Sequence, residues 1–139
     1  MDNLTAEQRR KNMQNIRSKG TMPERIVTRA LRQQKIYFAM HVTSLPGTPD
    51  IVFRRKKIVI FIDSDFWHGH PKRFIMPVTN CKYWKDKIDN NRARDKSVNR
   101  RLRKEGWTVL RVWEYDVKNN LDRVLYRILS IINKTDGGV

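Results

Sequence analysis

Cysteine and long apolar runs are both scarce in this chain. The single cysteine, Cys81, excludes a disulfide within the chain and fits a reducing cytoplasm. The longest apolar stretches, such as residues 58–62, fall far short of the roughly 18 to 20 residues that span a bilayer, so we expect no membrane helix. The first residues lack a basic segment followed by an apolar one, so we expect no secretion signal.

Acidic residues are few, and positive charge is in large excess. The 139 residues carry 30 Lys and Arg against 14 Asp and Glu, which gives a formal net charge of +16 and an isoelectric point of about 10.6. Such a charge repels itself and usually persists because the partner is a polyanion. Nucleic acid is therefore the first candidate partner, and an anionic membrane surface is the weaker one.

Hydrophobic periodicity predicts a single α/β domain over residues 1–139. A hydrophobic share of 39% is enough for one core in a chain of this length. We expect residues 1–20 to form a basic N-terminal helix or arm and residues 21–133 to form the core. The predicted order is helix, strand, strand, strand, helix, strand, helix, over residues 23–34, 36–42, 51–53, 58–62, 83–104, 108–113 and 121–132.

Local chemistry marks two helix ends and the central strand. Thr21 and Glu24 have the spacing of a capping box, with Pro23 in the first turn, and predict the start of the first helix. Gly106 predicts the end of the long helix. The strand at 58–62 is apolar throughout, as expected for a central strand buried on both faces.

Carboxylates gather where two predicted neighbouring strands begin and end. Asp50 follows Pro49 at the start of one strand, and Asp63 and Asp65 follow the next strand, so we expect them at one edge of the sheet. Glu24 on the preceding helix supplements them. Carboxylate oxygens are the ligands that Mg²⁺ prefers, and metal-assisted phosphodiester hydrolysis suits such a group beside a basic surface. The plainer alternative is that Asp50 only caps a turn after Pro49.

The order of these acids resembles the layout of PD-(D/E)xK nucleases. Asp63 and Asp65 stand thirteen and fifteen positions after Asp50, but the lysine of that pattern is missing. His68 is the available general base, because imidazole titrates near neutrality and can take a proton from water. A lone histidine is more often structural, yet this one follows two acids and two adjacent aromatic residues.

Over almost its whole length the sequence resembles the very-short-patch repair (Vsr) DNA mismatch endonucleases. The stretches that carry the resemblance are 11–16, Glu24 in its helix, 44–50, 59–61, 66–70, 84–87 with Asn90, Asn91, Arg94 and Asp95, and 106–110 with 112–114. The resemblance implies a restriction-endonuclease-like core, with a central mixed sheet flanked by helices. It also implies an enzyme that nicks one strand of duplex DNA 5′ to the thymine of a T·G mismatch.

The resemblance assigns roles at the expected site. Asp50 is expected to bind the catalytic Mg²⁺ directly, with Mn²⁺ as a substitute, and the backbone carbonyl near Ile62 is the second inner ligand. Glu24 is expected to reach the ion through water. His68 is expected to be the general base, and Asp95 a supporting acid on the long helix.

Aromatic wedges and basic residues are the expected DNA contacts. The resemblance implies that Phe66, Trp67 and Trp84 pry the site open, while Met13 inserts from the other groove. Inserting rings between bases costs roughly a few kcal/mol per step and least where pairing is defective, so mismatch preference can arise from this difference. Phosphate contacts are expected from the basic helix, at Arg92, Arg94 and Arg101 among others.

The sequence departs from the family in two places. Better-known members hold a structural zinc through one His and three Cys, whereas the matching positions here are Asp65, His70, Lys72 and Tyr115. Three of the four ligands are missing, so we predict no structural zinc. The second departure is Asp63, where those members have another catalytic histidine. A carboxylate there repels phosphate unless it binds metal or pairs with a cation, and its catalytic role is left open.

The leading interpretation is a Mg²⁺-dependent nicking endonuclease for T·G mismatches, acting as a monomer on double-stranded DNA at the nucleoid in a bacterial cytoplasm. Mismatch-repair proteins and an associated cytosine-5 methyltransferase are further expected partners. Two alternatives remain open. One is a homing or restriction-like endonuclease of the same fold with another target, and the other is a catalytically silent DNA-binding module.

Overall fold

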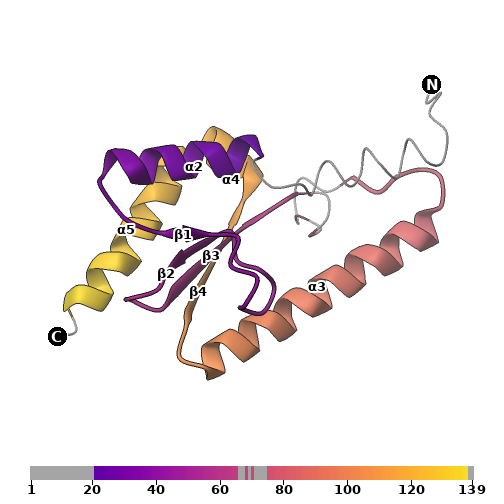
Figure 1. The fold of residues 1–139 in the computed structure, drawn as a ribbon. Helices are drawn as coiled ribbons and strands as arrows, with labels where there is room; N and C mark the ends of the chain where they lie inside the picture. Colours follow the sequence, from indigo (N-terminus) through magenta and orange to yellow (C-terminus); the bar gives the residue numbers. More distant parts are fainter. Residues whose placement is uncertain (1–20, 66–67, 69, 71–74, 138–139) are drawn as a thin grey trace.

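Helices and strands alternate along the chain in the computed structural model, which describes residues 21–137 except 66–67, 69 and 71–74 (Figure 1). The elements, in chain order, are α2 (Met22–Gln33), β1 (Ala39–Met40), β2 (Ile51–Phe53), β3 (Ile58–Asp63), α3 (Cys81–Lys104), β4 (Thr108–Trp113), α4 (Glu114–Asn119) and α5 (Leu121–Gly137). None of the helices in this part of the chain combines the length and the apolar character needed to cross a membrane.

The strands form one mixed sheet in the order β1-β2-β3-β4. β2 pairs antiparallel with both β1 and β3, and β4 lies parallel to β3 with Asp63 opposite Trp113. A parallel neighbour requires a crossover connection, and α3 lies within it. β2 and β3 are the two inner strands, and the residues of β3 are buried except the half-buried Ile62, as the unbroken apolar run predicts.

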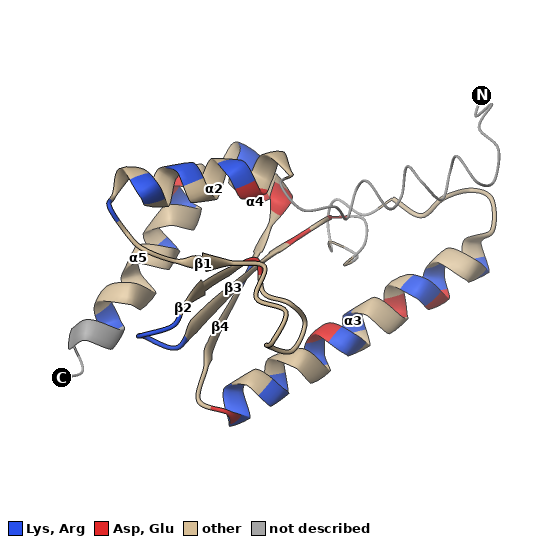
Figure 2. Ribbon diagram, viewed as in Figure 1, with Lys and Arg blue, Asp and Glu red and all other residues tan. Residues whose placement is uncertain are grey.

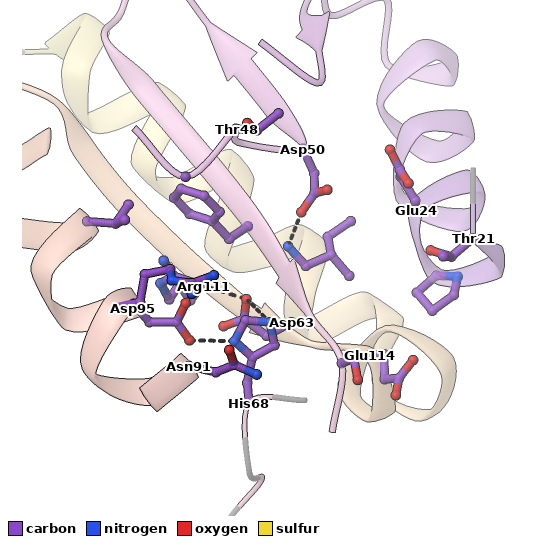
Figure 3. Close-up of a pocket in the computed structure, with 17 residues that line it drawn as sticks. Thr21, Glu24, Thr48, Asp50, Asp63, His68, Asn91, Asp95, Arg111 and Glu114 are labelled. Carbon is purple, nitrogen blue, oxygen red and sulfur yellow. Dashed lines mark hydrogen bonds and ion pairs between the residues drawn. The ribbon is translucent and has the colours of Figure 1, made fainter. Parts of the chain in front are cut away.

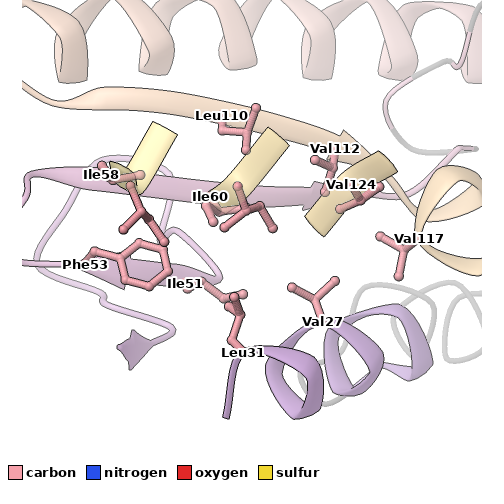
Figure 4. Packing of buried hydrophobic residues seen from close by; sticks show 12 residues of the cluster. Val27, Leu31, Ile51, Phe53, Ile58, Ile60, Leu110, Val112, Val117 and Val124 are labelled. Carbon is pink, nitrogen blue, oxygen red and sulfur yellow. The ribbon is translucent and has the colours of Figure 1, made fainter. Parts of the chain in front are cut away.

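Alternating side chains of the strands pack two layers of helices onto the sheet. Helices α2, α4 and α5 cover one face and α3 covers the other (Figure 1). On the first face, Ile60 belongs to a buried cluster with Leu31 of α2 and Ile128 of α5 (Figure 4). On the second face, Phe61 packs in a cluster with Leu102 of α3. Each fully buried side chain of this size contributes about 1.5 to 3 kcal/mol, so the two clusters hold the strand ends in place.

The loop at 45–49 fixes where β2 begins. Gly47 has a φ of +75°, and a Cβ at this position would lie 2.8 Å from Cγ1 of Val98 on α3. Glycine is therefore required both by the left-handed backbone and by the close approach to the helix. This turn delivers Asp50 to the edge of the sheet at a fixed position.

The predicted α/β class, the mixed sheet and the order of elements are confirmed, and they fit a restriction-endonuclease-like core. The stop at Gly106 is also confirmed, because α3 ends at Lys104 and Gly106 has a φ of +92°. The short helix α4 between β4 and α5 is an addition to the prediction. The expected N-terminal arm at 1–20 lies outside the described residues.

Two local predictions are wrong. The strand expected over 36–42 is only Ala39–Met40, because His41 adopts a left-handed φ of 49° and leaves the extended conformation. Thr21 is the N-cap of α2, but its side chain makes no capping hydrogen bond. The carboxylate of Glu24 contacts the ring of His41 instead, so the expected capping box does not describe this helix start.

Candidate active site

A cavity of about 400 Å³ opens where the ends of β2 and β3 meet α2 and α3 (Figure 3). All five candidate catalytic residues line it, together with Ile62 and Arg94: these five are Glu24, Asp50, Asp63, His68 and Asp95. They come from α2, from the start of β2, from the end of β3, from the segment after β3 and from α3. The fold thus brings together residues that are widely separated in the sequence.

Asp50 closes the end of the β2–β3 ladder. Its Oδ2 accepts a 2.7 Å hydrogen bond from the backbone N–H of Ile62, beyond the last ladder pair of Ile51 with Ile60. In a strand the N–H and C=O of one residue point to the same side. The Ile62 carbonyl therefore faces the side on which Asp50 lies, so two oxygen donors expected at the metal come from neighbouring strands.

Burial makes the charge of Asp50 costly. It raises the pKa of Asp50 from 3.8 to about 6, against the lowering effect of the Ile62 N–H, and the negative charge of Glu24 raises it further. A carboxylate that only capped the turn after Pro49 would be expected to face solvent. The buried Glu24 and the half-buried Asp50, with the Ile62 carbonyl beside them, fit a hard divalent cation, because the ion would offset their charge.

Glu24 and His41 complete this first group. Glu24 is only 3% exposed, and its Oε1 contacts Nε2 of His41. The N–H of His41 donates to the backbone oxygen of Asp50 over 3.2 Å, which ties the end of β1 to the start of β2. Ligand atoms of Glu24, His41 and Asp50 lie within 4.8 Å of one another. We refer to these three residues as the Asp50 group.

A second group is formed by Asp63, His68 and Asp95, whose ligand atoms also lie within 4.8 Å of one another. We refer to these three residues as the Asp63 group. Nδ1 of His68 contacts Oδ2 of Asp95. An ionised carboxylate only accepts hydrogen bonds, so against an ionised Asp95 the donor in this contact is Nδ1–H of the ring. Nε2 lies 3.7 Å from Oδ1 of Asp63. Nε2 is therefore the ring nitrogen on the Asp63 side, and Nδ1 is the one on the Asp95 side.

Arg111 of β4 supplies the cation that the sequence left open for Asp63. Its guanidinium NH1 lies 2.9 Å from Oδ1 of Asp63 and 3.5 Å from Oδ1 of Asp95. Burial raises the pKa of Asp63, and the charges of His68 and Arg111 oppose that rise. Asp63 is therefore part of an ion pair, which limits its repulsion of a phosphate.

Sequence reasoning missed both His41 and Arg111. His41 gave no signal, because a histidine at the end of a short strand does not show which helix it faces. Arg111 did give one, because it is a single charge inside the apolar strand Thr108–Trp113. A buried arginine needs a carboxylate partner, and the neighbouring strand ends in Asp63.

The described part of the chain includes four of the expected DNA contacts. Arg92, Arg94 and Arg101 are exposed on α3, where Figure 2 shows basic residues along the helix. Arg94 also lines the cavity, and Nε of Arg101 lies 3.5 Å from Oε1 of Glu105. Trp84 is half-buried, and the centre of its ring lies 5.0 Å from the centre of the Tyr83 ring. Three further expected contacts lie outside the described residues: Met13, Phe66 and Trp67.

The expected absence of a structural zinc stays a prediction. Cys81 is exposed at the start of α3, and its Sγ contacts the backbone oxygens of Pro77 and Val78. The centre of the His70 ring lies 4.6 Å from the centre of the Trp113 ring. Burial raises the pKa of Asp65, and the charge of Glu114 raises it further. Tyr115, another unmatched ligand position, lies in α4, and Lys72 lies outside the described residues.

Comparisons with known proteins identify the family of the chain. Residues 1–73 match the family model described as DNA mismatch endonuclease Vsr. The type II nicking enzyme V.XorIIP of Xanthomonas oryzae pv. oryzae is 43% identical over 133 residues, which cover 95% of this chain and 97% of the relative. The type II nicking enzyme V.NmeDIP of Neisseria meningitidis serogroup C is 41% identical over 139 residues, covering 99% and 94%.

A third relative carries the mismatch activity in its name. The DNA mismatch endonuclease Vsr of Escherichia coli (strain K12) is 39% identical over 107 residues, which cover 76% of this chain and 69% of the relative. The match to the family model covers more than half of the chain, and the relatives extend the similarity over nearly all of it. With its acid-lined cavity and these relatives, the chain belongs to the Vsr family and is a DNA endonuclease.

Proposed function

We propose that this chain is a Mg²⁺-dependent endonuclease that nicks one strand of duplex DNA 5′ to the thymine of a T·G mismatch. The observation that carries the proposal is that Asp50, Ile62 and the His68–Asp95 pair line one cavity. The names of the relatives, a DNA mismatch endonuclease and type II nicking enzymes, support a mismatched target and a single-strand cut. A catalytically silent DNA-binding module does not fit a chain of this family.

We assign the ion to Asp50, the Ile62 carbonyl and, through water, Glu24. Oxygen donors favour Mg²⁺, and Mn²⁺ with its similar ligand preference is the expected substitute. When bound, the ion supplies Lewis-acid stabilisation of charge on the phosphate and lowers the proton affinity of water. Asp50 provides the carboxylate charge that attracts it, and the Ile62 N–H keeps that carboxylate in place over 2.7 Å.

We assign proton transfer to His68, with Asp95 as its partner. The Asp95 carboxylate holds Nδ1 of the ring, so Nε2 is available to take the proton of the attacking water. A positioned general base of this kind contributes roughly a 10²- to 10⁴-fold rate increase. Asp63 lies beside Nε2, where its charge favours the imidazolium that forms.

We assign recognition to the aromatic wedges Phe66, Trp67 and Trp84, with Met13 from the other groove. The exposed arginines of α3 are the proposed phosphate contacts: Arg92, Arg94 and Arg101. A T·G pair is what deamination of 5-methylcytosine leaves in duplex DNA. We therefore propose a cytosine-5 methyltransferase and mismatch-repair proteins as partners. We also propose that the protein acts as a monomer in the bacterial cytoplasm.

A nicking assay tests target, metal and strand count together. Labelled duplexes with T·G, with other mismatches and with full pairing are incubated with Mg²⁺, with Mn²⁺ or with EDTA, and both strands are resolved. The proposal expects one cut, 5′ to the mismatched thymine, with either metal and none in EDTA. Equal cutting of paired DNA, or cuts in both strands, would favour a restriction-like or homing target instead.

Selectivity is tested by comparing a wedge residue with a phosphate contact. Aromatic stacking is worth about 1 to 3 kcal/mol per base, and only an openable site repays its unstacking cost. Trp67→Ala should therefore weaken binding of T·G duplex far more than binding of paired duplex. Arg101→Ala should weaken both alike and reduce the salt slope by about one. Binding in Ca²⁺ over a salt series measures both, and equal losses with Trp67→Ala would contradict the wedge.

A further inference from the structure

The side chain of Arg111 lines the cavity, and the proposed reaction gives it no role. We propose that Arg111 is a positioning residue of the nicking reaction. It holds Asp63 and Asp95 around the His68 ring and offsets the charge of Asp63, so that a DNA phosphate can enter the same cavity. This inference rests on the proposed function of the cavity. Arg111 lies in β4, and the family resemblance assigned it no role.

Arg111 contacts the two carboxylates that lie next to the two ring nitrogens of His68. One guanidinium nitrogen, NH1, approaches Oδ1 of Asp63 at 2.9 Å and Oδ1 of Asp95 at 3.5 Å. Asp63 faces Nε2 of His68 and Asp95 contacts Nδ1. A cation placed only to neutralise one buried acid would need one partner. Arg111 contacts the two acids that flank the ring from opposite nitrogens, so its position sets the position of the ring.

Arg111 is itself fixed on two further sides. Its Nε donates a 2.8 Å hydrogen bond to Oδ1 of Asn99 on α3, and its guanidinium lies 4.0 Å from the centre of the Phe61 ring on β3. The side chain is 17% exposed and lines the cavity. Arginine suits this place because its planar fork can bind acids and stack on an aromatic ring at once, which a lysine cannot.

Charge explains why the position needs a cation. Glu24, Asp50, Asp63 and Asp95 line a cavity that must also admit a phosphate. The proposed metal offsets charge beside Asp50, but Asp63 faces His68 and Arg111 and is only 5% exposed. Arg111 offsets this acid within the protein, so the phosphate does not meet an uncompensated carboxylate.

Four variants separate positioning from charge: Arg111→Gln, Arg111→Lys, Asp63→Asn and the double variant Arg111→Gln/Asp63→Asn. Arg123→Gln, at an exposed arginine of α5, is the matched control. Each protein is measured for affinity to a T·G duplex in Ca²⁺ and for single-turnover nicking rate in Mg²⁺. The low-field proton resonance of the His68 Nδ1–H, identified by its loss in His68→Ala, reports directly on the ring.

The expected results differ between affinity and rate. Arg111→Gln should weaken DNA binding about tenfold and slow nicking about 10²-fold, because Asp63 is uncompensated and the ring is misplaced. The double variant should bind within about threefold of wild type, since the pocket charge is restored, yet stay about 10²-fold slow with its low-field resonance lost. Arg111→Lys should bind normally and nick about tenfold slower.

Two outcomes would overturn the inference. A folded Arg111→Gln protein that nicks like Arg123→Gln would show that Arg111 does not position the ring. A double variant that binds as weakly as Arg111→Gln would show that Arg111 contacts phosphate itself rather than offsetting Asp63. If Arg111→Gln fails to fold, the nicking rates of Arg111→Lys and of the double variant still show whether Arg111 positions the ring. Failure of the wild-type protein to nick T·G duplex would instead reject the proposed function.

Discussion

The Asp50 group and the Asp63 group have the same composition, two carboxylates and one histidine, but differ in what balances their charge. In the Asp63 group, the guanidinium of Arg111 touches both acids. In the Asp50 group, burial and Glu24 raise the pKa of Asp50, and among the side chains that shift it only His41 lowers it. Arg111 thus balances the Asp63 group from within the protein, whereas the Asp50 group is the one that we propose binds a cation from solution.

This contrast assigns different chemistry to similar residues. A group that already contains a fixed cation is suited to hold a histidine in one tautomer and orientation, which is what proton transfer requires. A group of buried acids with a backbone oxygen beside it is suited to bind a divalent ion. The account therefore places the metal at Asp50 and the proton transfer at His68. Substitutions in either group separate the two roles.

The largest effect is expected from Asp50→Asn, which should abolish detectable nicking of a T·G duplex. The change removes the carboxylate charge that attracts the ion while keeping a side-chain oxygen for the Ile62 N–H. Affinity for the duplex in EDTA should be equal or higher, because a negative charge leaves a phosphate-binding cavity. Asp122→Asn, at an exposed acid of α5, makes the same charge change and is the control. Near wild-type cutting by Asp50→Asn would refute the metal assignment.

A smaller loss is expected from His68→Ala. Removing the general base should slow nicking by roughly 10²- to 10⁴-fold, because the bound ion and the rest of the cavity still act on the phosphate. Metal binding should be unchanged in this variant, since His68 belongs to the other group. Single-turnover rates in Mg²⁺ provide the measurement. A variant that cuts at the wild-type rate between pH 6 and 9 would remove His68 from this role.

The smallest effect concerns stability without metal. The folded protein keeps the Asp50 proton at pH values where the unfolded chain has released it, so its stability falls as pH rises from about 4 to above 6. The difference between 3.8 and about 6 corresponds to about 3 kcal/mol. Asp50→Asn should recover most of this in EDTA at pH 8, measured by urea unfolding.

Control measurements sharpen this stability test. A shallower fall with pH should remain in Asp50→Asn, because burial also raises the pKa of Asp63 and Asp65. Mg²⁺ should stabilise the wild-type protein at pH 8 and leave Asp50→Asn unaffected. An equal pH dependence in both proteins would mean that Asp50 carries no buried charge in the absence of metal.

Much of the fold could be predicted because its signals are local. The apolar run of β3 and the glycine after α3 mark their elements directly, and both predictions are confirmed. The extent of β1 could not be predicted, since His41 leaves the strand conformation within an apparently regular alternation. The contact between Glu24 and His41 could not be predicted either, because it joins residues from different elements.

The candidate site was predictable for the residues that follow strands and motifs, but not for those that complete their charge. Asp50 directly precedes β2 and His68 lies in the segment after β3, where the sequence order already brings acids together. Arg111 acts across a parallel strand pair, Asp63 with Trp113, whose register no sequence pattern fixes. Residues that position another side chain, rather than contact the substrate, are therefore the hardest to predict from a single sequence.

Metal binding by two matched variants tests the division between the groups most directly. Mn²⁺ is titrated into wild-type, Asp50→Asn and Asp63→Asn proteins without DNA, and free Mn²⁺ is followed by its electron paramagnetic resonance signal. Each variant replaces one carboxylate that lines the same cavity by an amide. The account predicts that Asp50→Asn weakens Mn²⁺ binding at least about 10²-fold and that Asp63→Asn stays within about threefold of wild type. Loss of binding in Asp63→Asn with retention in Asp50→Asn would contradict it.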